Sequence, residues 1–347
     1  MLYINRNMLK TMVMTGIVTV GCMTSQASAK DQVRIVGSST VYPFSTVVAE
    51  RFGRTTPYKT PIVESTGTGG GFKLLCAGVG ADTVDVSNAS RAIKSSEVDL
   101  CARNGVNNII EVKIGYDGIV IANAKGANKF NLTTRDLFLA LAKNVPDANG
   151  QLVANGAVIW SDVNPSLPNA EIEVLGPPPT SGTRDAFVEL AMESGCKTFD
   201  WIGALKKSDK NQYKEICHTI REDGLFIEVG ENDNLVVQKL VANTNALGIF
   251  GFSFLDQNSD KVQASKINGT DVSFEAISDG SYPISRPLLF YVKGEHLSNV
   301  PSLKPFIEAF ISDEASGEDG YLSDRGLIPM GAVERRAYQA AITAKLK

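Results

Sequence analysis

The sequence predicts an α/β protein built from two domains. Strand-like and helix-like segments alternate along the chain, and several strands lead through a Ser/Thr/Gly-rich loop into a helix. Removal of a predicted leader, residues 1–29, leaves 318 of the 347 residues, which is more than one hydrophobic core usually serves. Loops that follow the strands of an open α/β sheet gather beyond the carboxyl ends of those strands, where ligands bind.

The clearest strand–loop–helix unit is residues 180–187, which follow three prolines at 177–179. The prolines end the preceding segment, because proline cannot continue a helix or donate a backbone hydrogen bond. Ser181, Gly182 and Thr183 then open a predicted helix with Arg184 in its first turn. Unpaired amides at a helix start, with hydroxyls and a cation beside them, make a site for a small anion. The alternative is an ordinary N-cap, for which Ser and Thr are preferred.

Three further segments share this pattern. Each has a short apolar strand, a loop rich in Ser, Thr and Gly, and a helix; the loops lie at residues 37–43, 65–71 and 87–91. One capped helix is ordinary, whereas four hydroxyl-rich helix starts indicate a common ligand.

The rest of the chain continues the alternation. Residues 109–123 are predicted as a buried strand passage, Thr133 as the start of a helix, and residues 160–165 as a loop. A strand is predicted at 171–175 and an apolar strand at 288–292. The sequence contains no fixed-period repeat and no low-complexity linker.

Residues 1–29 have the pattern of a signal peptide. A basic start and an apolar stretch at 12–20 precede an A-x-A cleavage site at 27–29. We therefore expect cleavage after residue 29 and a product exported to the periplasm. The alternatives are a buried N-terminal helix and a lipid anchor on Cys22, which Thr19 disfavours because lipoprotein signals usually carry Leu there.

The charge balance excludes two classes of partner. The chain has 34 basic and 38 acidic residues, a net charge of −4, and loss of Arg6 and Lys10 with the leader makes it −6. An acidic protein of this kind is not expected to bind nucleic acid or an anionic membrane. An anion site must therefore depend on local geometry rather than on a positive field of the whole molecule.

Four cysteines remain after the leader: Cys76, Cys101, Cys196 and Cys217. They allow three pairings, of which the pairing of neighbours, 76 with 101 and 196 with 217, is favoured in an oxidising compartment. Each such bond would contribute about 3 kcal/mol by restricting the unfolded chain. A metal site is disfavoured because the chain has no C-x-x-C and only two histidines, at 218 and 296.

Several motifs together resemble the phosphate-binding proteins of bacterial phosphate ABC importers, which are periplasmic, two-domain "Venus flytrap" proteins. The motifs lie at residues 37–41, 66–72, 88–91, 181–184, 246–249 and 282–287, so the resemblance covers nearly the whole mature chain. It implies two mixed sheets with helices on both faces, joined by crossing hinge strands.

The resemblance also implies an organisation and a function. Domain one would comprise residues 30–117 and 286–347, and domain two residues 118–285. The protein would bind inorganic phosphate in the cleft between domains and deliver it to an ABC-type membrane permease. It would work as a monomer without a cofactor.

By the same resemblance, the anion contacts are hydroxyls and amides at helix starts. They would fall on Ser39, Thr40, the amide of Val41, Thr68, Ser181, Gly182 and Thr183.

Two positions depart from the family pattern. Relatives carry an Asp where this chain has Ser90, and an Arg where it has Pro177. We expect Arg184, and next Arg91, to supply the missing cation. Asp117 is a candidate for the missing proton acceptor, or it caps its own turn. Because that acceptor distinguishes phosphate from sulfate, another tetrahedral oxyanion is the alternative ligand.

Two other function classes are disfavoured. A hydrolase would use Ser39 or Ser181 as nucleophile, but neither lies in a G-x-S-x-G motif, and no Asp/His cluster suits a metal-dependent phosphatase. The glycines at 67, 69 and 71 are too closely spaced for a dinucleotide fingerprint. A third class, an exported adhesin-like protein with a vestigial pocket, remains as an alternative. We expect no enzymatic activity.

Overall fold

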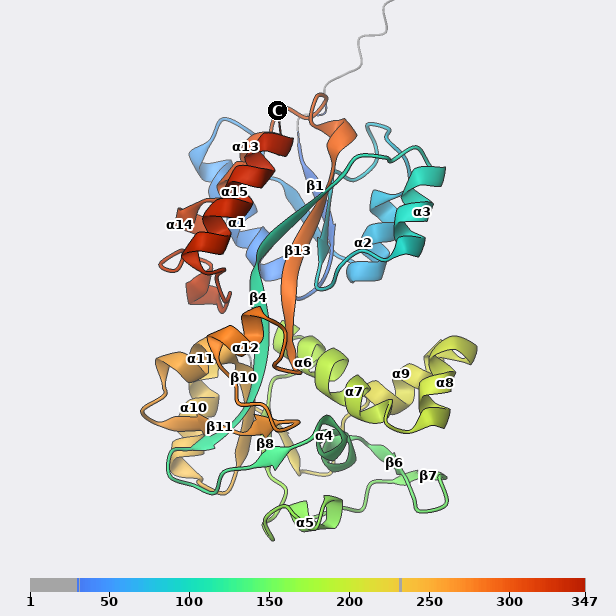
Figure 1. Cartoon of the computed structure of the whole chain (residues 1–347), viewed down its shortest axis with the longest axis vertical. Helices are drawn as coiled ribbons and strands as arrows, with labels where there is room; N and C mark the ends of the chain where they lie inside the picture. Colours follow the sequence, from blue (N-terminus) through green and yellow to red (C-terminus); the bar gives the residue numbers. More distant parts are fainter. Residues whose placement is uncertain (1–29, 31, 231–232, 347) are drawn as a thin grey trace, which may run out of the picture.

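The structure is a computed structural model, and it describes residues 30, 32–230 and 233–346. Two lobes are stacked along the long axis and joined by strands β4 (Ile109–Ala124) and β13 (Ser285–Lys293) (Figure 1). The predicted leader, its cleavage site and Cys22 lie outside the described residues. None of the helices in the described part of the chain is long and apolar enough to cross a membrane.

Within the described residues, nine strands form one hydrogen-bonded sheet that passes through both lobes. Its order is β2-β1-β3-β13-β4-β10-β8-β9, and β11 also pairs with β4. Parallel and antiparallel pairs are mixed in each lobe, as predicted. The bounds are β1 (Arg34–Gly37), β2 (Ile62–Ser65), β3 (Val86–Ala89), β8 (Val174–Gly176), β9 (Phe226–Glu228), β10 (Leu247–Gly251) and β11 (Val262–Ala264).

Helices cover both faces of the sheet in the upper lobe (Figure 1). On one face lie α1 (Tyr42–Thr55), α13 (Leu303–Ile311), α14 (Asp313–Ser316) and α15 (Ala332–Lys345); on the other lie α2 (Thr68–Leu75) and α3 (Ser95–Arg103). Phe44, Phe52 and Phe306 fill the core on the first face, and Phe72 packs against Tyr291 on the second. Each face is therefore covered by its own apolar core.

The lower lobe has the same layering. One core lies under α4 (Thr134–Leu141), α8 (Asp200–Ser208), α9 (Lys210–His218) and a continuous helical run. That run comprises α6 (Gly182–Phe187), a π-helical turn (Val188–Met192) and α7 (Glu193–Cys196). Another core lies under α10 (Asp233–Ala242) and α11 (Phe252–Gln257). The smaller elements are α5 (Trp160–Val163), α12 (Phe274–Ser278), β5 (Asn131–Leu132), β6 (Asn144–Pro146), β7 (Leu152–Ala154) and β12 (Lys266–Ile267).

The two segments that the sequence predicts to cross between domains pair directly with one another. Arg286 of β13 lies opposite Asp117 of β4, and the flanking pairs are Ser285 with Gly118 and Pro287 with Tyr116. The division of the chain at 117/118 and 285/286 stays a prediction.

Both disulfides predicted from the sequence are present. Cys76 bonds Cys101, which joins the end of α2 to α3, and Cys196 bonds Cys217, which joins α7 to α9. The pairing of neighbours is therefore confirmed, and each bond lies within one lobe.

Two local predictions are wrong. The loop predicted from residue 87 begins only after Ala89, because β3 is paired on both sides, with β1 and β13, which satisfies its backbone despite polar side chains. Residues 160–163 form α5 rather than a loop. The Asp162 carboxylate accepts hydrogen bonds from the amides of Val158 and Ile159, both at 3.0 Å, and these bonds cap the short helix. Its first residue, Trp160, is buried.

Candidate anion site

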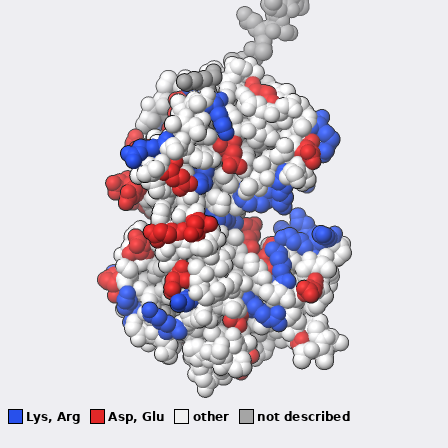
Figure 2. Space-filling view, viewed as in Figure 1, with Lys and Arg blue, Asp and Glu red and all other residues white. Residues whose placement is uncertain are grey.

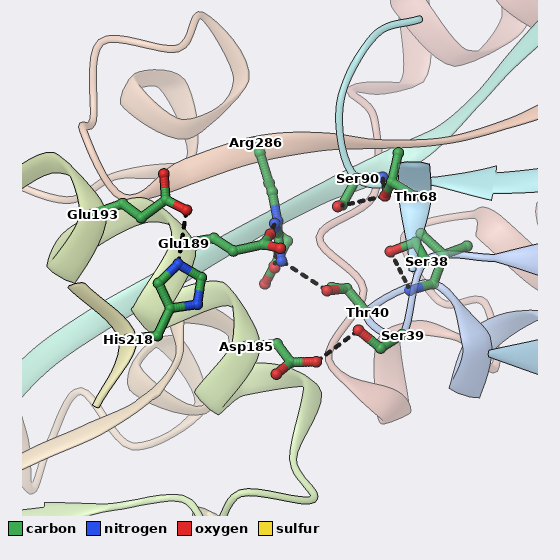
Figure 3. Close-up of polar contacts among 12 residues, drawn as sticks. Ser38, Ser39, Thr40, Thr68, Ser90, Asp185, Glu189, Glu193, His218 and Arg286 are labelled. Atoms are coloured by element: carbon green, nitrogen blue, oxygen red, sulfur yellow. Dashed lines mark hydrogen bonds and ion pairs between the residues drawn. The ribbon is translucent and has the colours of Figure 1, made fainter. Parts of the chain in front are cut away.

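The loop after β1 is shaped by a glycine. Gly37 has φ of 128°, and a Cβ there would lie 2.2 Å from the carbonyl oxygen of Asn88, so only glycine fits. The next residue, Ser38, donates its amide to the same oxygen at 3.0 Å, and its Oγ accepts the amide of Val41 at 3.4 Å. This turn leaves Ser39 and Thr40 projecting from the end of the strand (Figure 3).

The starts of α2 and of the segment after β3 come together. Thr68 Oγ1 lies 3.1 Å from Ser90 Oγ and accepts the Ser90 amide at 3.2 Å. The close approach requires Gly71, because a Cβ there would lie 2.4 Å from Ser87 Oγ and 2.7 Å from Gly37 Cα. Three of the predicted hydroxyl-rich loops therefore meet at one edge of the upper lobe.

A buried donor lies beside these loops. Asn88 is 1 % exposed, its Oδ1 accepts the hydroxyl of Ser45 at 2.9 Å, and its Nδ2 finds no hydrogen-bond partner among the described residues. A buried amide of this kind costs free energy unless a partner satisfies it. The sequence motif at 88–91 contains this residue, but sequence reasoning did not single it out.

The start of α6 in the lower lobe lies against the loop after β1. Ser181 caps the helix, accepting the Thr183 amide at 3.2 Å, as an N-cap does. A Cβ on Gly182 would lie 3.5 Å from Thr40 Cα, and Asp185 accepts a hydrogen bond from Ser39 Oγ at 2.6 Å. The hydroxyl-rich helix start of the lower lobe thus faces that of the upper lobe, as the sequence predicts for a shared ligand.

The two arginines predicted to supply a cation have partners in their own lobes. Arg184 donates to the carbonyl of Pro177 at 2.9 Å and lies 3.6 Å from Glu228, and its guanidinium lies over the Phe226 ring. Burial lowers the pKa of Arg184, against the effect of Glu228. The carboxylate that pairs with Arg184 is that of Glu228, in the same lobe.

Arg91 is held by a single carboxylate. It donates to both oxygens of Glu97, at 2.9 and 2.7 Å, and its guanidinium lies over the ring of Phe72. Burial acts to raise the pKa of Glu97, but the hydrogen bonds from Arg91 and from the Lys94 amide, together with the charges of these two residues, hold the pKa below its ordinary value.

Sequence reasoning missed a third arginine, Arg286. Its side chain is 6 % exposed and lies between the lobes (Figure 3). It donates to Thr40 Oγ1 at 2.7 Å and to Glu189 Oε2 at 2.6 Å, and its Nε lies 3.3 Å from Asp117 Oδ2. The signal in the sequence was the pairing of the two predicted crossing segments, which places Arg286 opposite Asp117.

The site is rich in carboxylates. Asp117, Asp185 and Glu189 lie around Arg286 and the Ser39–Thr40 loop (Figure 3). Burial raises the pKa of Asp117 despite the opposing effect of Arg286, and Glu189 raises it further. Figure 2 shows the molecule narrowing between the lobes, with acidic and basic side chains along both facing edges.

The histidine of the lower lobe belongs to a separate ion cluster. His218 Nε2 lies 2.8 Å from Glu193, which also accepts hydrogen bonds from Lys206 and Tyr213, both at 2.9 Å. Burial acts to raise the pKa of Glu193, but these partners hold it well below its ordinary value. No group of three or more His, Cys, Asp or Glu in the described ranges could hold a metal ion.

A groove of about 730 Å³ lies between the lobes at a different place. It is lined by α11, by α12 and by residues 327–332. None of the predicted anion-binding residues lines it. The hydroxyl-rich site is therefore distinct from this groove.

Comparison with known proteins decides the family. A family model described as "PBP superfamily domain" matches residues 24–314. The chain belongs to the PBP superfamily.

Named relatives of this PBP superfamily member include a phosphate-binding protein. The phosphate-binding protein PstS of Staphylococcus haemolyticus is 31 % identical over 301 residues, which cover 85 % of this chain and 81 % of the relative. Protein SphX of Synechococcus elongatus is 29 % identical over 312 residues, 88 % of this chain and 78 % of the relative.

Solved structures show the same fold. The crystal structure of a possible phosphate binding protein from Planctomyces limnophilus superposes with a TM-score of 0.73 and 27 % identity, covering 92 % of this chain and all of the other. The family and the two-lobed α/β fold predicted from the sequence are thereby confirmed.

Proposed function

We propose that this PBP superfamily member binds inorganic phosphate between its lobes and delivers it to the membrane permease of an ABC importer. The observation that carries the proposal is that two hydroxyl-rich helix starts from different lobes face one another, with Gly182 beside Thr40 and Ser39 hydrogen-bonded to Asp185. Helix starts offer amides and a positive dipole end to an anion. The relative from Staphylococcus haemolyticus is named a phosphate-binding protein, which favours phosphate over other oxyanions.

The proposed contacts come from both lobes. The upper lobe would offer Ser39, Thr40, the Val41 amide, Thr68 and Ser90, with the unpaired Asn88 amide as one more donor. The lower lobe would offer Ser181, Gly182 and Thr183. From the sequence, Arg184 and next Arg91 are expected to supply the cation. Hydroxyls suit this ligand because they can donate to its oxygens or accept from its protons.

We also propose where and in what form the protein acts. The chain would be exported with cleavage after residue 29, and would act in the periplasm as a monomer that needs no cofactor and catalyses no reaction. The lobes, divided at 117/118 and 285/286, would close on the anion by hinge motion.

Isothermal titration of the mature protein with phosphate, sulfate and arsenate tests the proposal. We expect stoichiometric phosphate binding, with the phosphate recovered unchanged after incubation. Binding of sulfate in preference to phosphate would instead favour the alternative of another tetrahedral oxyanion. Release of phosphate from a phosphate ester by the protein would favour a hydrolase.

A further inference from the structure

We propose that Arg286 is the cation that faces the bound anion, and that Glu189 holds the same guanidinium until the anion displaces it. This inference rests on the proposed function, since it concerns the same site. It names a ligand-binding residue and an internal competitor for it.

Arg286 differs from the two other arginines in what it connects. Arg184 is engaged within the lower lobe and Arg91 within the upper lobe. Arg286 instead lies at the crossing of the lobes, and it is hydrogen-bonded to Thr40, a predicted anion contact. A dianion that leaves water needs a cation nearby, and a buried guanidinium next to the ligand hydroxyls provides it.

The two carboxylates on Arg286 are not equivalent. Asp117 belongs to β4, directly opposite Arg286 in the sheet, and its side chain is 16 % exposed. Glu189 comes from the helical run of the lower lobe and is 52 % exposed. A half-exposed glutamate can return to water at low cost, whereas a buried aspartate cannot. Glu189 is therefore the partner that an incoming anion would replace, while Asp117 keeps the guanidinium in place.

The geometry brings the competitors to one guanidinium. Nη2 of Arg286 donates to Thr40 and Nη1 donates to Glu189. An anion bound at Thr40 and the Glu189 carboxylate would therefore both contact the terminal nitrogens of the same guanidinium. Asp185, one helical turn before Glu189, accepts the hydrogen bond of the Ser39 hydroxyl, which is also a proposed anion contact. With Asp117 and Glu189 both in place, the formal charges of the guanidinium and its two carboxylate partners sum to −1. This net negative charge opposes the binding of an anion. Displacement of Glu189 removes that opposition.

The two substitutions should move phosphate affinity in opposite directions. Arg286→Gln removes the cation and should weaken phosphate binding by about 30-fold or more, the usual loss when a buried charge pair is cut. Glu189→Gln removes the competitor and should strengthen phosphate binding about two- to fivefold, the range of a half-exposed ion pair. If Arg286→Gln fails to fold because Asp117 loses its partner, Arg286→Lys is the second variant. It keeps the charge but loses the paired guanidinium nitrogens, and should bind phosphate at least tenfold more weakly than the parent.

Matched controls separate these effects from general charge changes. Arg335→Gln alters another buried arginine, which pairs with Asp313 in the upper lobe, and Glu314→Gln alters another glutamate paired with an arginine, Arg51. Both should leave phosphate affinity within about twofold of the parent. Isothermal titration with inorganic phosphate is the measurement, with thermal unfolding to verify that each variant is folded.

The outcomes distinguish this inference from the proposed function. A parent protein that binds no phosphate contradicts the proposed function itself. A parent that binds phosphate, with a folded Arg286→Gln variant that binds within twofold of it, overturns the role of Arg286. A Glu189→Gln variant that binds no more tightly than the parent overturns the exchange. A loss in Arg184→Ala as large as that in Arg286→Gln would return the role of cation to Arg184.

Discussion

Ser39 on the loop after β1 donates a hydrogen bond to the carboxylate of Asp185 in α6 over 2.6 Å. The two residues are 146 positions apart in the sequence and belong to different lobes (Figure 3). Ser39 is a proposed phosphate contact, so a carboxylate lies one hydrogen bond away from the proposed ligand. This relationship bears directly on which oxyanions the protein accepts.

Asp185→Asn should change the selectivity between oxyanions. A carboxylate beside the ligand accepts a hydrogen bond from the hydroxyl of monohydrogen phosphate, whereas sulfate at neutral pH has no proton to donate and is repelled. We expect the ratio of phosphate to sulfate affinity to fall about tenfold in the variant, the effect of one unsatisfied buried acceptor. Competition titrations measure the ratio, and Asp223→Asn, which alters the partner of Arg221 elsewhere in the lower lobe, is the control. An unchanged ratio would remove Asp185 from the site.

Thr68→Val should weaken phosphate binding about tenfold, because the isosteric valine loses a hydroxyl that is proposed to contact the ligand. The loss of its bonds to Ser90 should lower the free energy of unfolding by about 1 kcal/mol. Thr46→Val on α1 is the control, because that hydroxyl only donates to the carbonyl of Tyr42. Equal phosphate affinity for both variants in isothermal titration would argue against Thr68 as a contact.

Removal of the disulfide of the lower lobe should cost stability without affecting affinity. Cys196 and Cys217 are 21 residues apart and tie α7 to α9. Replacing both with Ser should lower the free energy of unfolding by about 2–4 kcal/mol, because the unfolded chain regains the freedom that the bond removed. Urea unfolding measures the loss, and phosphate titration should match the parent. A variant as stable as the parent would contradict the structural role of this bond.

Lys293 should make stability depend on pH in the alkaline range. It is fully buried, with Nζ donating to the Gly78 carbonyl and to Thr83 Oγ1. Burial lowers the pKa of Lys293 from 10.5 to about 8, against the opposing effect of Asp85 and with a smaller contribution from Lys30. Between these two values the unfolded chain keeps its proton while the folded protein has lost it, so stability rises with pH.

Comparison with Lys293→Met isolates this contribution. The difference in the free energy of unfolding between the parent and the variant should shift in favour of the parent by up to about 3 kcal/mol as the pH rises from 8 to above 10. Urea unfolding at several pH values measures the difference, in which the titration of tyrosines cancels. A difference that stays constant over this range would mean that Lys293 keeps an ordinary pKa.

The sequence predicted those parts of the fold and site that depend on neighbouring residues. Ser39, Thr68 and Ser181 each lie near a helix start with a local signature, and the structure places them at such starts. The extension of β3 through Asn88 was missed because it depends on strands that pair from both sides.

The role of Arg286 was missed for a similar reason. Its partners Asp117, Glu189 and Thr40 are 169, 97 and 246 positions away in the sequence. A cation is recognisable from sequence only when a local motif holds it, and this one is held by the way the lobes come together.

The connection through β4 determines which residues of the two lobes meet. β13 pairs with β4 at nine positions, with one register shift at Leu288/Leu289. Sliding of one strand along the other by a single residue would turn every side chain to the opposite face and break this ladder. The lobes can therefore tilt and twist about the ribbon, but they cannot shear along it. In the proposed hinge closure, this fixed register would bring the same residues of the two lobes together each time.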